Sequence, residues 1–182
     1  DPGASVTGAA AGENVTRRTA ESHSVVDVVG LNYGETRYAM DAELFPARVI
    51  VGSETFGPEI GRLWPLVVEH PHVIGDFCWT GWDYLGEVGI GSVAYASDAA
   101  PPGLEREFPW LTAWCGDLDI TGWRRPLSFY REIAFGLRSE PYLAVLRPSR
   151  AGDPVVSNSP WAWSDSVSAW TWPGFEGRVV EV

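Results

Sequence analysis

The stretch RVIVGSETFG (residues 48–57) is an apolar, β-branched run that ends in Ser53, Glu54 and Thr55. A strand core seldom runs straight into a glutamate, because an unpaired buried carboxylate is strongly unfavourable. Similar apolar runs occur at VVDVVGLNY (25–33) and HVIGDFCW (72–79), and helical patterns follow the first two runs, over about 36–44 and from Pro58 onward. Continuous apolar runs that alternate with helices predict parallel βαβ units whose strands are buried on both faces.

The rest of the chain has a different pattern. Residues 81–109 are rich in Gly, Pro and Ala and show no periodicity, which predicts a long and functional loop. Residues 124–138 predict a helix that begins at Pro126. From Pro141 onward apolar and polar residues alternate, which predicts an antiparallel sheet with one wet face. We expect a domain boundary in the Pro-, Ser- and Gly-rich segment from about residue 148 to 160.

Composition excludes several classes of partner. The 182 residues carry a net charge of −11 and no large basic cluster, so nucleic acid and anionic membranes are poor partners. No apolar run is long enough to span a bilayer, and no signal-peptide pattern begins at Asp1. The sequence leaves the location open, although we expect a bacterial cytoplasmic location rather than secretion. The two cysteines predict buried free thiols. Ten tryptophans make a carbohydrate ligand more plausible, since indole rings stack on sugars.

Polar and aromatic residues occupy the C-terminal ends of the three predicted strands, where α/β folds place their ligands. They are Asn32 and Tyr33, then Glu54, then Trp79. A glutamate beside a tyrosine hydroxyl and tryptophan faces fits a retaining glycosidase, in which a second carboxylate lies about 5–5.5 Å away. Structural alternatives remain open: Glu54 as a helix N-terminal acid, Tyr33 and Trp79 as packing residues. His70 and His72 make a poor metal site, and we expect no metal.

Four segments resemble consecutive parts of glycoside hydrolase family 2, most closely its bacterial β-galactosidase branch. They are RVIVGSET, VIGDFCWTGWDYLGEVGIG, GDLDITGWRRPLSFYRE and SAWTWPGFEG. The resemblance implies that residues 1–147 are the last three βα units of a (β/α)8 TIM barrel. It implies that residues 148–182 are a linker and the first strands of an antiparallel β-sandwich. It further implies hydrolysis of β-glycosides with retention and without an organic cofactor.

The resemblance also assigns residues. It implies that Glu54 is the catalytic nucleophile and that Tyr33 donates a hydrogen bond to it. Trp79 resembles the tryptophan on the floor of the sugar subsite, with a possible cis peptide bond to Thr80, and Glu87 resembles a carboxylate that contacts sugar hydroxyls. Asn32 and Asp83 are further substrate-binding candidates, although Asp83 and Glu87 also suit a structural role in capping the turn.

One catalytic residue of the family, the acid/base glutamate, has no counterpart in this sequence. The family's acid/base glutamate follows an asparagine, whereas Glu13 precedes one and lies in the small-residue segment before the first predicted strand. We therefore expect the second carboxylate upstream of Asp1, the isolated chain to be inactive, and the open barrel edge to promote self-association.

Two other functions stay open at this stage. The first is a non-catalytic carbohydrate-binding module that stacks sugars on its tryptophans and does not need Glu54. The second is a small α/β structural or interaction domain. The acidic residues Asp83 and Glu87 favour a neutral sugar, such as a β-galactoside, over a uronic acid.

Overall fold

The computed structural model describes residues 16–98, 106–157, 159–180 and 182. The chain divides into two compact units. Unit 1 comprises Asp1–Thr55 and Arg62–Cys78, and unit 2 comprises Phe56–Gly61 and Trp79–Val182. Glu13 lies outside the described residues. The domain boundary expected near residue 148 stays a prediction.

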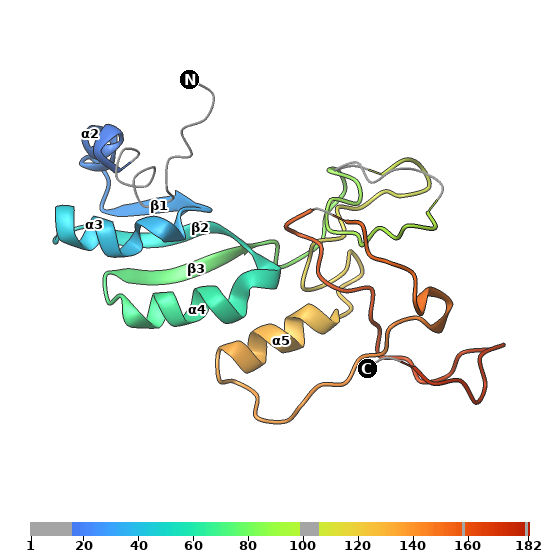
Figure 1. The fold of residues 1–182 in the computed structure, drawn as a ribbon. Coiled ribbons are helices and arrows are strands. Elements are labelled where there is room, and N and C mark those ends of the chain that lie inside the picture. The colour runs from blue at the N-terminus through green and yellow to red at the C-terminus, as the bar shows by residue number, and fades with distance from the viewer. Residues whose placement is uncertain (1–15, 99–105, 158, 181) are drawn as a thin grey trace, which may run out of the picture. The chain divides into compact units, whose positions relative to one another are not determined.

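Unit 1 is built on a three-stranded parallel sheet in the order β1-β2-β3. The strands are β1 (Val28–Asn32), β2 (Val49–Phe56) and β3 (Val73–Trp79), close to the three apolar runs of the sequence. Helix α3 (Tyr38–Leu44), preceded by η1 (Glu35–Arg37), connects β1 to β2, and η2 (Gly57–Glu59) and α4 (Ile60–Glu69) connect β2 to β3 (Figure 1). A short α2 (Ala20–His23) precedes β1. The predicted order of strands and helices is confirmed.

One face of this sheet carries the hydrophobic core. Val29 and Leu31 point to the same side of β1 and cluster with Ile50 of β2, together with Tyr38 of α3 and Val67 of α4. Both connecting helices therefore pack on one face. Burial along β1 alternates between exposed and buried residues. The prediction that the strands are buried on both faces was wrong for β1, because neither helix covers its second face.

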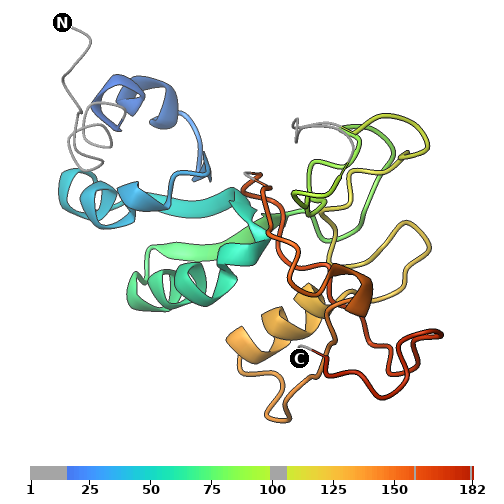
Figure 2. The same ribbon diagram turned by 45° about the vertical axis from the view of Figure 1, so that its right-hand side comes forward.

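Unit 2 contains little regular structure. Besides the first two residues of α4, the described part of unit 2 contains α5 (Pro126–Ala134), which begins at Pro126 as predicted, and the 3-10 turns η2 and η3 (Pro148–Arg150). The described part of residues 81–109 forms neither helix nor strand, as expected of a loop. Isolated bridges pair distant segments, among them Leu85 with Thr112 and Tyr95 with Val155. Figure 2 shows the segment that follows α5, in orange to red, running without strands.

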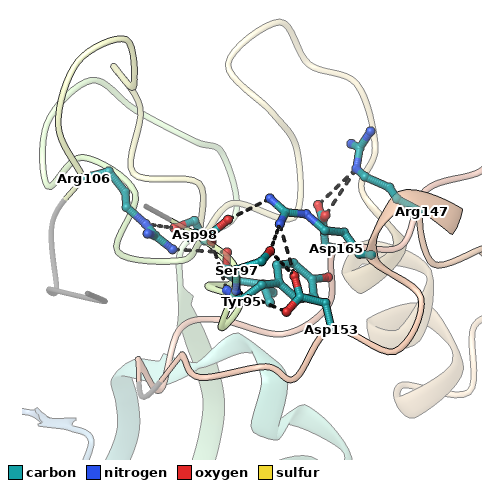
Figure 3. A network of polar contacts seen from close by, with 10 residues as sticks. Tyr95, Ser97, Asp98, Arg106, Arg147, Asp153 and Asp165 are labelled. Atoms are coloured by element: carbon teal, nitrogen blue, oxygen red, sulfur yellow. Dashed lines mark hydrogen bonds and ion pairs between the residues drawn. The ribbon is translucent and has the colours of Figure 1, made fainter. Parts of the chain in front are cut away.

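Side-chain contacts hold these long connections in place (Figure 3). The Arg150 guanidinium lies 2.8 Å from a carboxylate oxygen of Asp98 and 3.4 Å from one of Asp153. It also lies 4.6 Å from the ring centre of Tyr95, which is buried. One arginine thus joins the segment at residues 95–98 to the segment at 150–153, which are more than 50 positions apart.

The predicted fold class was wrong. The described residues form an open three-stranded parallel sheet with a few helices, and they show neither a TIM barrel nor an antiparallel sandwich. Three strands are too few to close a barrel, which requires about eight. In the described part of the chain after Pro141, pairing is limited to isolated antiparallel bridges, Val145 with Val167 and Val155 with Tyr95. Alternation predicts a strand, but a strand also needs a neighbouring strand to satisfy its backbone groups.

No helix in the described residues is long and apolar enough to cross a membrane.

Candidate active site

The main chain places Tyr33 beside Glu54. The amide of Tyr33 donates a hydrogen bond to the carbonyl oxygen of Glu54 at 2.8 Å. The pairing of β1 with β2 shifts register at this point, because Leu31 aligns with Gly52 whereas Asn32 aligns with Glu54. Such bulges redirect side chains at the end of a sheet. The structure therefore brings together Asn32, Tyr33 and Glu54, as their positions at strand ends predict, while the side-chain bond from Tyr33 to Glu54 stays a prediction.

Backbone strain coincides with the predicted site. Among the described residues, three that are not glycine have positive φ: Tyr33 at 48°, Glu87 at 40° and Trp114 at 67°. The left-handed region is unfavourable for residues with a Cβ atom, and such strain is concentrated at functional positions. Two of these three residues were assigned to the site from the sequence.

A second acidic residue adjoins the end of β2. Asp76 of β3 accepts a short hydrogen bond from the hydroxyl of Thr55, which also bonds to the carbonyl of Phe77 at 3.2 Å. Burial raises the pKa of Tyr38 to about 12, and the nearby Asp76 adds to this effect. Sequence reasoning missed Asp76, although an acid within the apolar run 72–79 was the available signal. The hydrogen bond between Thr55 and Asp76 therefore joins β2 to β3 one residue after Glu54.

Unit 2 carries the other predicted residues on a chain of hydrogen bonds. The indole N–H of Trp79 donates to the Tyr84 hydroxyl at 2.9 Å, and that hydroxyl donates a short bond to the Glu87 carboxylate. The rings of Trp79 and Tyr84 also meet edge to face, with centroids 5.5 Å apart. The peptide bond between Trp79 and Thr80 is cis, as the resemblance implied. Tyr84 thus links the two residues that sequence reasoning assigned to sugar contact.

Tyr84 is the main site residue that the sequence reasoning missed. Burial and the hydrogen bond to Glu87 raise its pKa well above the ordinary range of a tyrosine. Its phenol therefore keeps its proton and acts as a donor to Glu87 throughout the physiological range. The only signal in the sequence was its place in the segment DYLGE, and nothing there indicates which partners a tyrosine chooses.

Asp83 has a structural environment. It is 3% exposed, it accepts a bond from the Trp114 amide at 2.8 Å, and it pairs with Arg125 at 2.8 Å. Both carboxylate oxygens therefore have partners within the protein. These contacts favour the structural alternative for Asp83, and its assignment to substrate stays a prediction.

The remaining candidates differ in exposure. Asn32 and Glu87 are exposed, whereas Glu54, Tyr33 and Trp79 are half-buried. Neither Cys78 nor Cys115 forms a disulfide within the described residues, and Cys115 is buried as predicted, whereas the predicted burial of Cys78 was wrong because it is only half-buried. Burial raises the pKa of Cys115 to about 12. Within the described ranges, no cluster of three or more His, Cys, Asp or Glu side chains is placed to hold a metal ion.

Two solved structures resemble this chain over most of its length. One is a glycosyl hydrolase family 2 member from Bacteroides cellulosilyticus, with 38% identity over 85% of this chain and a TM-score of 0.66. The other is a family 2 member from Bacteroides cellulosilyticus DSM 14838, with 32% identity over 89% of this chain and a TM-score of 0.60. No protein-family model and no curated protein matches the chain.

The chain is related to glycosyl hydrolase family 2. It spans about a fifth of the length of these two family 2 structures, since it covers 20% of the first and 18% of the second. The relationship to glycoside hydrolases expected from the sequence is confirmed at this level.

Proposed function

We propose that this chain contributes the nucleophile and part of the sugar subsite to a retaining β-glycosidase of family 2. The observation that carries the proposal is the pairing of strained Tyr33 with Glu54 at the C-terminal ends of adjacent parallel strands. The identity to two family 2 structures supports it. A half-buried carboxylate at such an edge suits a role as nucleophile.

In the proposed reaction the Glu54 carboxylate attacks the anomeric carbon while the glycosidic C–O bond breaks. The leaving oxygen takes a proton from a second carboxylic acid, and a covalent glycosyl-enzyme forms. Water, deprotonated by that second group, then attacks the same carbon and releases Glu54. The Tyr33 phenol orients the Glu54 carboxylate during both steps.

The proposed sugar contacts come from the Trp79–Tyr84–Glu87 chain. The indole of Trp79 provides an apolar face for the sugar ring, and Glu87 accepts hydrogen bonds from sugar hydroxyls. An acidic residue in this place disfavours a uronic acid, because two carboxylates repel each other. We therefore propose a neutral substrate, a β-galactoside.

The proposed reaction needs a second carboxylate as its acid/base group, and we assign this role to a residue outside the described part of the chain. A glutamate that follows an asparagine and is encoded upstream of Asp1 fills the role. Reading the gene upstream tests this part directly. An in-frame Asn-Glu pair at the end of an apolar run supports it, and a start codon immediately before Asp1 contradicts it.

The nucleophile is tested by covalent trapping. In the protein encoded by the complete reading frame, a dinitrophenyl 2-deoxy-2-fluoro-β-galactoside should inactivate the enzyme and label Glu54, as found by peptide mass spectrometry. Its good leaving group needs no acid catalyst, so labelling reports the nucleophile alone. Glu54→Gln should abolish labelling and turnover, with Glu59→Gln as the matched control. A label on another residue contradicts the assignment.

We also propose that the isolated chain has no glycosidase turnover and that it self-associates. Its sheet exposes Val28 and the β3 residues Ile74 and Phe77, the last two more than 60% exposed, and exposed apolar strands favour association. Enzyme-like hydrolysis of nitrophenyl β-galactoside by the isolated chain contradicts the first statement, and a concentration-independent monomer in sedimentation contradicts the second.

A further inference from the structure

A pocket of ≈ 190 Å³ lies within unit 2, lined by parts of residues 114–127 and 161–168. Its walls carry four tryptophans: Trp114, Trp123, Trp161 and Trp163. Among the described residues that line it, neither Trp79 nor Glu87 occurs. A concave site with this density of indole rings is characteristic of small-molecule binding.

Neighbouring residues hold three of the four rings in place. Trp163 stacks on Tyr130 with centroids 5.8 Å apart and planes inclined by only 8°. Trp161 meets Phe56 edge to face at 5.4 Å. Arg125 lies over the ring of Trp114 at 4.2 Å. Rings held in this way lose little conformational entropy when a ligand binds.

Trp123 provides the accessible ring of the pocket. Its side chain is 74% exposed, whereas that of Trp163 is 42% exposed. The backbone amide of Trp123 is fixed by a bond to the Asp119 carboxylate at 2.9 Å. A large apolar ring at the mouth of a pocket, on a fixed backbone, suits stacking on the face of a ligand.

The charges in the pocket are compensated within the protein. Arg125 pairs with Asp83 at 2.8 Å, Arg124 with Glu132 at 3.1 Å and Arg147 with Asp165 at 3.3 Å. Each arginine thus has an acidic partner, so the pocket offers no unpaired cation to an anionic ligand. The groups that remain available to contact a ligand are indole faces and hydroxyl groups.

Hydroxyl groups line the pocket beside the tryptophans. Ser164 and Ser166 are joined by a hydrogen bond of 2.8 Å between their oxygens, and both belong to the lining. Their remaining donor and acceptor positions match the hydroxyl groups of a polyol. Aromatic faces together with neutral hydroxyl groups select an uncharged, ring-shaped and polyhydroxylated ligand.

We propose that this pocket is a binding site for neutral saccharides, with a sugar ring stacked on Trp123 and hydroxyl contacts to Ser164 and Ser166. This inference goes beyond the proposed catalytic function, because none of its residues belongs to the Tyr33, Glu54 and Trp79 set. The site retains a saccharide whether or not Glu54 is chemically active.

The test measures saccharide binding to the full 182-residue chain by calorimetry and tryptophan fluorescence. The neutral probes are lactose, cellobiose and xylobiose, and the acidic probe is digalacturonate. We expect at least one neutral probe to bind more tightly than the acid. Trp123→Ala should weaken that binding by about tenfold, and Trp123→Phe should restore most of it, since a phenyl ring still stacks.

Two controls fix the location of the site. Trp170 is similarly exposed, at 61%, and is absent from this lining, so Trp170→Ala should leave the affinity unchanged. Glu54→Gln should also leave it unchanged. Absence of binding by every neutral probe to a folded chain overturns the proposal. So does tighter binding of the acid, or a loss of affinity in Glu54→Gln but not in Trp123→Ala. The trapping experiment at Glu54 is independent of all these outcomes.

Discussion

Unit 1 and unit 2 of this chain are stabilised in different ways. Unit 1 has three hydrogen-bonded strands over one apolar cluster that includes Ile50, which is 0% exposed. The described part of unit 2 has helix α5 and isolated bridges, and its segments are joined by ion pairs such as Asp83–Arg125 and Asp98–Arg150.

The difference shows that apolar burial and ion pairing place different demands on the sequence. Burial of apolar surface is non-directional, so any properly spaced apolar run contributes to the core of unit 1. An ion pair requires two particular side chains in one geometry. The division is one of degree, since unit 1 also pairs Arg48 with the buried Asp41 and unit 2 has a small cluster of Ile90, Ala113 and Cys115. Unit 1 should therefore respond mainly to changes of volume and unit 2 mainly to changes of partner.

The largest expected effect is in unit 1. Replacing Ile50 by Ala leaves a cavity in a fully buried site and should cost about 4 kcal/mol of unfolding free energy. Amide hydrogen exchange should show the loss of protection in β1, β2 and β3. The control Val68→Ala, at a site 68% exposed, should change little. Equal loss of protection in unit 2 contradicts separate stabilisation of the units.

The matching change in unit 2 removes Asp83. Asp83→Ala leaves Arg125 and the Trp114 amide without their partner, and should cost about 3 kcal/mol. Nine of the ten tryptophans lie in unit 2, all but Trp64, so fluorescence during denaturation reports this unit. Arg147→Ala, which breaks a more exposed pair, should cost no more than about 1 kcal/mol. Similar losses in the two variants refute the importance of the buried pair.

A smaller effect is expected at Tyr84. Tyr84→Phe keeps the ring but removes the acceptor of the Trp79 indole N–H and the donor to Glu87, which should cost about 1 kcal/mol. In the protein encoded by the complete reading frame, the variant should raise KM for the galactoside more than it lowers kcat. Tyr142→Phe serves as the control, and a fall in kcat alone contradicts the positioning role.

The smallest effect is a pH dependence in unit 2. The amide of Tyr95 lowers the pKa of Asp98, and the bond to Arg150 adds to this shift. A lowered carboxyl pKa adds stability above its unfolded value of about 4, and that stability is lost as the pH falls through the folded pKa. Asp98→Asn should therefore be less stable at pH 7 and lose less stability below pH ~4. An unchanged acid profile relative to wild type, with Glu140→Gln as control, contradicts this role.

Much of unit 1 follows from local pattern. The apolar runs predicted the three strands within a few residues, and Pro58 and Pro126 marked the helix starts. The prediction of a partial TIM barrel and the start of a sandwich was wrong because it assumed strand partners that the described residues do not form. Closure of a barrel depends on strands that are far away in the sequence. The apolar pattern of one strand gives no information about those distant strands.

The candidate site divides in the same way. The sequence by itself determined that Asn32, Tyr33 and Glu54 stand at strand ends, since parallel strands present their C-terminal ends at one edge. Only the tertiary structure showed that Tyr84 joins Trp79 to Glu87, and that Asp83 is paired with Arg125, 42 positions away. Periodic burial is encoded by neighbouring residues, whereas the partner of a buried polar group is chosen by the folded geometry, because each donor requires one acceptor at one distance and angle.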